Sequence, residues 1–269
     1  SSSIRNEGDR YGFSYSHLVV GDNFKPEVGF VRRDDFRQNR ASAQFTPRPT
    51  SIDAIRKFEL KGDIDYLTNK TTGILESRDI GARFEVEFEN TDRVNFDVSD
   101  KHEFLFEEFQ IGDDVTLPIG GYDFRNVRVN YRLGANRRVP GNISFTRGGF
   151  FSGDRTIVNL NGRIEVSPRL ALEPRIQLNW IDLPEGSLNT KLASTRVNFA
   201  LTTRLLVAAL LQYNSSSDSM STNIRLRWEY EPGSDLFVVY SEGRETDHRG
   251  FPRVSNRGLV VKFTRLFRM

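Results

Sequence analysis

The stretch Ile80-Gly81-Ala82-Arg83-Phe84-Glu85-Val86-Glu87-Phe88 decides the fold class. Every even position in it is apolar or small, and from Arg83 onward every odd position is charged. Successive side chains of a β-strand point to opposite faces, so this segment predicts a strand with one apolar face and one charged face. The same period recurs at 94–98, 158–166, 176–180 and 224–230, and no long stretch follows a convincing helical period. The sequence therefore predicts an all-β chain.

Fourteen strands follow from this pattern. We expect them at about 11–20, 38–47, 52–66, 72–89, 93–107, 121–133, 140–151, 154–166, 169–182, 189–202, 204–214, 219–231, 235–244 and 257–269. Connections after even-numbered strands are mostly short, whereas several after odd-numbered strands are longer, at 21–37, 108–120, 183–188 and 245–256. This alternation is typical of an up-and-down antiparallel transmembrane β-barrel with short periplasmic turns and longer extracellular loops. We expect a single barrel domain over 1–269.

Two architectures can carry such strands, and they differ in which face is wet. A soluble sandwich or barrel buries its apolar face, whereas a membrane barrel turns that face to lipid and encloses a polar lumen. Many of the expected strands reach the ~9–11 residues that cross a bilayer. Aromatic residues also collect toward segment ends, as at Trp180, Trp228 and Tyr240. Strand length, the charged face and these aromatic residues favour the membrane barrel.

Composition excludes several classes of protein. The chain has 269 residues, with 38 Lys plus Arg and 36 Asp plus Glu, so the net charge is 38 − 36 = +2. No cysteine is present, which excludes disulfides and thiolate chemistry. The longest apolar run has seven residues, Leu205 to Leu211, too few for a membrane-spanning helix. The near-neutral charge argues against a nucleic-acid surface.

Three segments resemble a known family. They are Gly21 to Arg33 (GDNFKPEVGFVRR), Phe109 to Phe124, and Gly233 to Gly243 (GSDLFVVYSEG). Together they look like the C-terminal β-barrel of a bacterial outer-membrane family of uncharacterised function. In that family the barrel usually follows an N-terminal domain similar to family-nine carbohydrate-binding modules. The resemblance implies an outer-membrane barrel that is a mature or trimmed part of a longer chain, and it implies no reaction.

If the apolar face is outward, the inward residues form two walls of opposite charge. The acidic wall comprises Glu59, Asp63, Asp65, Glu85, Glu87 and Asp97. The basic wall comprises Arg128, Arg132, Arg163, Arg175, Arg196, Arg225, Arg227 and Lys262. Opposed charges across a water-filled lumen create a transverse field that selects and orients polar solutes. The competing interpretation is a network of ion pairs that fills and stiffens the barrel.

The leading hypothesis is a passive outer-membrane conduit or translocation pore with a charged lumen. One alternative is a plugged barrel, closed by 21–37 or 108–120, that anchors an accessory domain or partner protein. Another is an outer-membrane hydrolase, which would draw on His17, His102 or His248, although the sequence favours a non-enzymatic role. We expect no metal, cofactor or nucleic acid. The expected partners are membrane lipid or lipopolysaccharide, barrel-assembly machinery, and a polar or carbohydrate solute or a partner protein.

Overall fold

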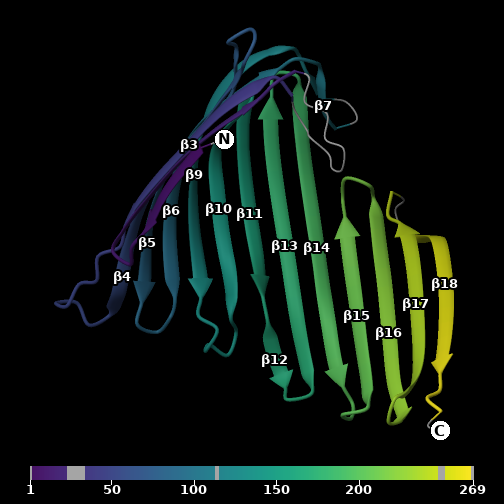
Figure 1. Ribbon diagram of the computed structural model, residues 1–269. Helices are drawn as coiled ribbons and strands as arrows, with labels where there is room; N and C mark the ends of the chain where they lie inside the picture. Colours follow the sequence, from purple (N-terminus) through teal and green to yellow (C-terminus); the bar gives the residue numbers. More distant parts are fainter. Residues whose placement is uncertain (1, 23–33, 113–114, 248–251, 268–269) are drawn as a thin grey trace. The chain divides into compact units, whose positions relative to one another are not determined.

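A computed structural model describes residues 2–22, 34–112, 115–247 and 252–267, and the regular elements in this part of the chain are β-strands (Figure 1). The strands are β1 (Ser2–Glu7), β2 (Tyr11–Val20), β3 (Phe36–Phe45), β4 (Ile55–Asn69), β5 (Leu75–Phe88), β6 (Arg93–Leu105), β7 (Phe109–Gly112), β8 (Val115–Leu117), β9 (Gly120–Leu133), β10 (Gly141–Phe150), β11 (Gly153–Gly162), β12 (Ile164–Ser167), β13 (Leu170–Leu183), β14 (Gly186–Ala200), β15 (Leu205–Asn214), β16 (Ser219–Glu231), β17 (Ser234–Glu245) and β18 (Arg253–Thr264). A search of the described residues finds no helix with the length and apolar character needed to cross a membrane.

Sixteen strands form one antiparallel sheet. Its hydrogen-bonded order is β1-β2-β3-β4-β5-β6-β9-β10-β11-β13-β14-β15-β16-β17-β18, and β12 pairs with β13 beside this path. The prediction of an all-β, antiparallel chain is confirmed. The number of strands differs from the fourteen expected for two reasons. Ser2–Glu7 adds β1, and the strand expected at 154–166 is divided into β11 and β12 at Arg163.

The chain forms two compact units. Unit 1 comprises Ser1–Tyr131, Ser144–Thr156 and Trp180–Leu188, and unit 2 comprises Arg132–Ile143, Ile157–Asn179 and Asn189–Met269. Strands β1 to β6 and the β7–β8 hairpin belong to unit 1, whereas β12 and β15 to β18 belong to unit 2. The expected acidic wall therefore lies in unit 1. The expected basic wall lies in unit 2, except for Arg128.

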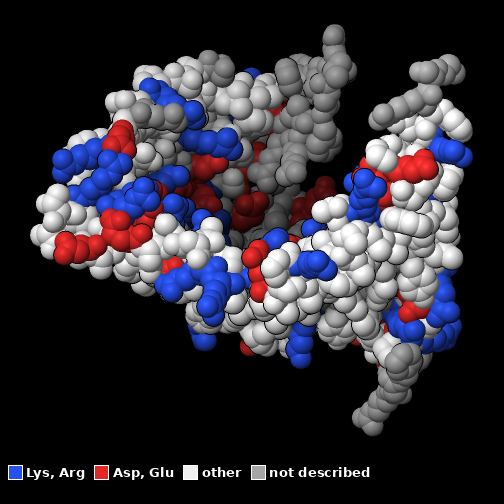
Figure 2. Space-filling view, turned by 90° about the horizontal axis from the view of Figure 1, so that it is seen from below, with Lys and Arg blue, Asp and Glu red and all other residues white. Residues whose placement is uncertain are grey.

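Short turns join many consecutive strands because their residues tolerate tight backbone geometry. Between β5 and β6, the side chain of Asn90 accepts a hydrogen bond from the backbone N–H of Asp92 at 2.9 Å. Between β16 and β17, Gly233 has φ = +79°, a conformation that glycine adopts without steric cost. Lys and Arg side chains lie beside Asp and Glu side chains in the view from below (Figure 2). Both turns thus contain residues that favour tight backbone geometry, as their sequences predict.

In unit 1 the strand register separates an apolar face from a charged face. Leu60, Phe84 and Phe96 are direct neighbours on β4, β5 and β6, and all three side chains are substantially exposed. On the opposite face Arg83 is paired with Asp97. Side chains that face each other across antiparallel strands lie within contact distance. The alternation read from the sequence is therefore maintained across neighbouring strands as continuous rows.

In unit 2 the same separation holds, with one difference. Trp228 on β16 lies opposite Leu236 on β17, and these side chains belong to the apolar face. On the other face Arg225 lies between Ala208 of β15 and Val239 of β17. The charged face of unit 2 is thus interrupted by apolar residues, because β15 and the first half of β17 carry apolar residues on both faces.

The β7–β8 hairpin forms the main hydrophobic cluster of the described residues. Leu117 is 0% exposed and Val115 is 4% exposed, and both pack with Ile181 and Leu183 at the end of β13. Partly buried side chains complete the cluster: Leu105, Ile111, Phe150, Phe151 and Leu188. Ile181 and Leu183 alternate along β13 with residues of the apolar face, such as Trp180. The hairpin therefore covers part of the charged face of unit 1.

Candidate functional site: the charged face of the sheet

The acidic residues of unit 1 lie on one face, beside basic residues of neighbouring strands. The six positions Glu59, Asp63, Asp65, Glu85, Glu87 and Asp97 alternate with apolar positions on β4, β5 and β6. Arg83 Nε donates to Asp97 at 2.5 Å, and Arg40 Nε donates to Asp65 at 2.8 Å. Opposite charges that face each other across strands neutralise one another. Five of the six carboxylates of the acidic wall have a cation within 4 Å, whereas Asp63 has none among the described residues.

Among the acidic residues of unit 1, Glu87 has three basic side chains close to its carboxylate, and its own side chain is only 4% exposed. Its carboxylate lies 3.1 Å from Arg56 Nη1, 3.1 Å from Arg93 Nη2 and 3.6 Å from Lys57 Nζ. Arg93 also reaches Glu85, at 3.6 Å. A buried carboxylate needs such cation partners because transferring an unpaired charge out of water costs on the order of several kcal/mol. This cluster is an ion-pair network of the kind that stiffens a sheet.

The basic residues of unit 2 are compensated less completely. Arg163 pairs with Glu173 at 2.8 Å, and Arg227 pairs with Asp235 at 3.1 Å. Arg225 Nε instead donates to the neutral side chain of Asn223 at 3.0 Å. Within the described ranges, no carboxylate forms an ion pair with the remaining predicted residues of unit 2, which are Arg132, Arg175, Arg196, Arg225 and Lys262, or with Arg128 of unit 1. The charged face of unit 2 therefore carries uncompensated positive charge.

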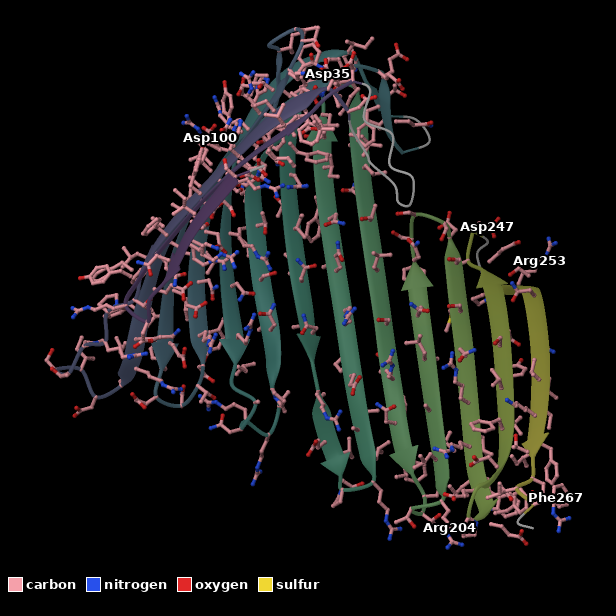
Figure 3. All side chains as sticks on the ribbon, viewed as in Figure 1. Asp35, Asp100, Arg204, Asp247, Arg253 and Phe267 are labelled. Carbon is pink, nitrogen blue, oxygen red and sulfur yellow. The ribbon has the colours of Figure 1, made fainter. Side chains whose placement is uncertain are left out.

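A groove of 470 Å³ opens on this face of unit 2. It lies toward the β14–β15 turn, where Arg204 marks the end of the strands (Figure 3). Its polar lining includes Arg163, Arg225 and Arg227. Its apolar lining includes Leu206, Ala208, Phe237 and Val239. A second hollow of 260 Å³, lined by Arg196, Asn198, Asn223 and Arg225 among others, shares Arg225 with the first.

Sequence reasoning did not identify the apolar part of this groove. Leu206, Ala208 and Leu210 belong to the apolar run Leu205 to Leu211, in which no alternation indicates which residues face inward. The register places Leu206 opposite Arg227 and Ala208 opposite Arg225, which assigns both to the charged face. The sequence offered only indirect evidence. Polar and apolar residues alternate clearly along β16, so its arginines would assign the faces of β15 residues once the register of the two strands is known.

Two of the three histidines named for the hydrolase alternative lie in the described part of the chain, and each contacts a neighbouring polar side chain. His17 Nδ1 lies 2.8 Å from the side-chain oxygen of Asn39, and His102 Nδ1 lies 3.0 Å from Asp123 Oδ1. His102 shares the apolar face of β6 with Val98, near the end of the strand. His248 lies outside the described residues. Among the residues that the structure describes, no group of three or more His, Asp or Glu side chains is arranged to hold a metal ion.

Exposed apolar rows cover the face opposite the charges in each unit. In unit 1 the rows include Tyr11, Phe13, Leu60, Phe84 and Phe96, and in unit 2 they include Ile224, Trp228, Leu259, Val261 and Phe263. Soluble monomers rarely expose contiguous apolar patches larger than a few hundred Å². These rows therefore require a covering medium or partner.

Comparisons with known proteins identify no family. No family model matches the chain, and no curated protein matches it at a significant level of sequence similarity.

Proposed function

We propose that the chain closes into a transmembrane β-barrel of a bacterial outer membrane, with the apolar rows facing lipid. The apolar positions of β5 run from Ile80 to Phe88, eight residues apart. At ~3.3 Å per residue they cover about 26 Å along the strand, or about 20 Å along the membrane normal after a typical strand tilt. This height approaches the ~25 Å apolar band of membrane barrels. The proposed partners are membrane lipid or lipopolysaccharide, and barrel-assembly machinery during insertion.

We further propose that the barrel is a passive conduit that prefers small anions. The observation that carries this proposal is the difference in charge compensation between the two units. Carboxylates of unit 1 are largely neutralised by neighbouring cations, whereas Arg175, Arg196 and Arg225 in unit 2 have no carboxylate partner among the described residues. Uncompensated arginines along a water-filled lumen lower the energy of anions and raise that of cations.

A second candidate function is a plugged barrel that anchors a partner protein or an accessory domain. The observation that favours it is the β7–β8 hairpin, which covers part of the charged face through the buried side chains of Val115 and Leu117. Such a hairpin either narrows a lumen or closes it. Conductance separates the two functions because a closed lumen passes no ions.

The test is single-channel conductance of the purified chain in a planar bilayer, with the reversal potential measured under a salt gradient. We expect stable conductance with anion preference. Arg196→Glu with Arg225→Glu should move the reversal potential toward cation preference. The control is Arg204→Glu, in the turn before β15, which should leave the selectivity unchanged. A folded but silent chain would overturn the conduit, as would equal shifts in the control and the double variant.

A further inference from the structure

The groove on the charged face of unit 2 combines two kinds of surface that an ion pathway alone does not need. Its floor is formed by Leu206 and Ala208 of β15 together with Phe237 and Val239 of β17. The register explains this floor, since Leu206 lies opposite Arg227 and Arg227 lies opposite Phe237. The apolar residues therefore lie on the two strands that flank β16, and the arginines of β16 lie between them.

Arg225 is the arginine of β16 in this floor that has no carboxylate partner among the described residues. It lies between Ala208 and Val239 in the register, so its side chain emerges from the apolar surface. Its Nε donates to Asn223 Oδ1, and Asn223 in turn donates to Ser241 Oγ at 2.8 Å. This chain of hydrogen bonds orients the guanidinium without neutralising it. The two terminal nitrogens remain suited to a bidentate contact with a carboxylate.

Two other arginines of the groove are paired with carboxylates, whereas Arg169 lies in the turn between β12 and β13. Arg227 is held by Asp235, and its guanidinium carbon lies 5.7 Å from the centre of the Phe237 ring. Arg163 is held by Glu173 and Glu165. The groove volume of 470 Å³ lies within the ~300–1,000 Å³ range of small-molecule sites. The groove thus offers an apolar surface, space for a small molecule and two arginines without an ion-pair partner among the described residues: Arg225 on β16 and Arg169 in the turn between β12 and β13.

We infer that this groove binds a small amphiphilic carboxylate, with its carboxylate on Arg225 and its apolar ring or short chain on Leu206, Ala208, Phe237 and Val239. The inference names the solute class of the proposed conduit, and in that respect it rests on the proposed function. A carboxylate without an apolar body leaves the floor in contact with water. A neutral molecule of the same shape leaves the guanidinium without its anionic partner. Both should therefore bind more weakly.

The test is equilibrium binding of 3-phenylpropanoate to the full chain in lipid nanodiscs, measured by titration calorimetry. The amide 3-phenylpropanamide and the short acid acetate serve as comparison ligands. We expect Arg225→Gln to weaken 3-phenylpropanoate binding by about tenfold or more, the loss that accompanies removal of one charge-assisted contact. The matched control is Arg175→Gln, because Arg175 is also unpaired in unit 2 but does not line this groove.

A second variant tests the floor without altering charge. Ala208→Leu places a larger side chain between Asn198 and Arg225 and should weaken phenylpropanoate binding while leaving acetate binding unchanged. Equal losses in Arg225→Gln and Arg175→Gln would overturn the inference. So would acetate or the amide binding as tightly as phenylpropanoate, or no binding at millimolar ligand. Parallel conductance separates the two proposals: a silent chain that binds refutes only the conduit, and a conducting chain that does not bind refutes only the groove.

Discussion

Replacing Leu117 by alanine should release the β7–β8 hairpin from the charged face of unit 1. Leu117 is 0% exposed and packs against Val115, Ile181 and Leu183. Truncating a buried leucine typically costs about 2–5 kcal/mol, because transfer free energy is lost and a cavity remains. An isolated two-stranded hairpin is only marginally stable, so this cost falls on local opening of the hairpin rather than on the whole sheet.

The expected magnitude follows from that cost. At ~1.4 kcal/mol per factor of ten, 2–5 kcal/mol raises the open fraction by about 30-fold to several-thousand-fold. Hydrogen exchange followed by mass spectrometry should show amides of β7 and β8 exchanging faster by such a factor, while amides of β5 and β6 are unchanged. The matched control is Thr116→Ala, an exposed neighbour on β8 that should leave exchange as it is. Unchanged exchange in Leu117→Ala, or equal acceleration in the control, would refute the reasoning.

Three further predictions concern single positions. Arg48 donates to both carboxylate oxygens of Asp9 and lowers the pKa of that carboxyl below its ordinary value of 3.8, so Arg48→Gln should raise its titration midpoint in an NMR experiment. The stabilisation from this pair is present above the unfolded pKa and is lost as pH falls through the folded one. Leu60→Arg on the apolar face should destabilise the chain by about 2–4 kcal/mol in urea unfolding from lipid vesicles, and a cost near zero would contradict a lipid-facing position. Gly148→Ala should cost about 1–3 kcal/mol in the same assay, because φ is +153° and a Cβ would lie 2.1 Å from a backbone carbonyl oxygen. Gly62→Ala should cost less, because its Cβ would lie 3.9 Å from the nearest atom, at an ordinary contact distance.

Much of the fold was predictable because alternation is a local signal. The alternation in a segment such as Ile80 to Phe88 predicts both a strand and the face on which each of its side chains lies. The strand β1 was missed because Ser2–Glu7 contains a single large apolar residue, Ile4, and therefore shows no alternation. It is identified only by its pairing with β2.

The β7–β8 hairpin was missed for a different reason. Phe109 and Ile111, followed by Val115 and Leu117, do alternate, but they lie within 108–120, which the sequence pattern predicts to be a connection between strands. Its role depends on Ile181, which is distant in the sequence, and no local pattern predicts that contact. The sequence also could not predict which charged residues form ion pairs, because this depends on the register of neighbouring strands.

The paired charges of β5 and β6 also restrict how these two strands can align during folding. A slip by one residue is prevented by the exchange of faces, but a slip by two residues keeps every apolar side chain on its own face. In the observed register three oppositely charged pairs coincide, namely Arg83 with Asp97, Asp79 with Lys101, and Glu87 with Arg93.

A two-residue slip in one direction would place Glu85 opposite Asp97 and Asp79 opposite Glu103, so that attraction is replaced by repulsion. A slip in the other direction would leave Asp79 opposite Ser99 and Arg83 opposite Asn95, so that on this face one oppositely charged pair, Glu85 with Arg93, would replace the observed three. The charges thus distinguish alignments that hydrophobicity alone treats as equivalent. These charge pairs therefore select the strand register while the sheet forms, in addition to their effect on the charged face of the folded chain.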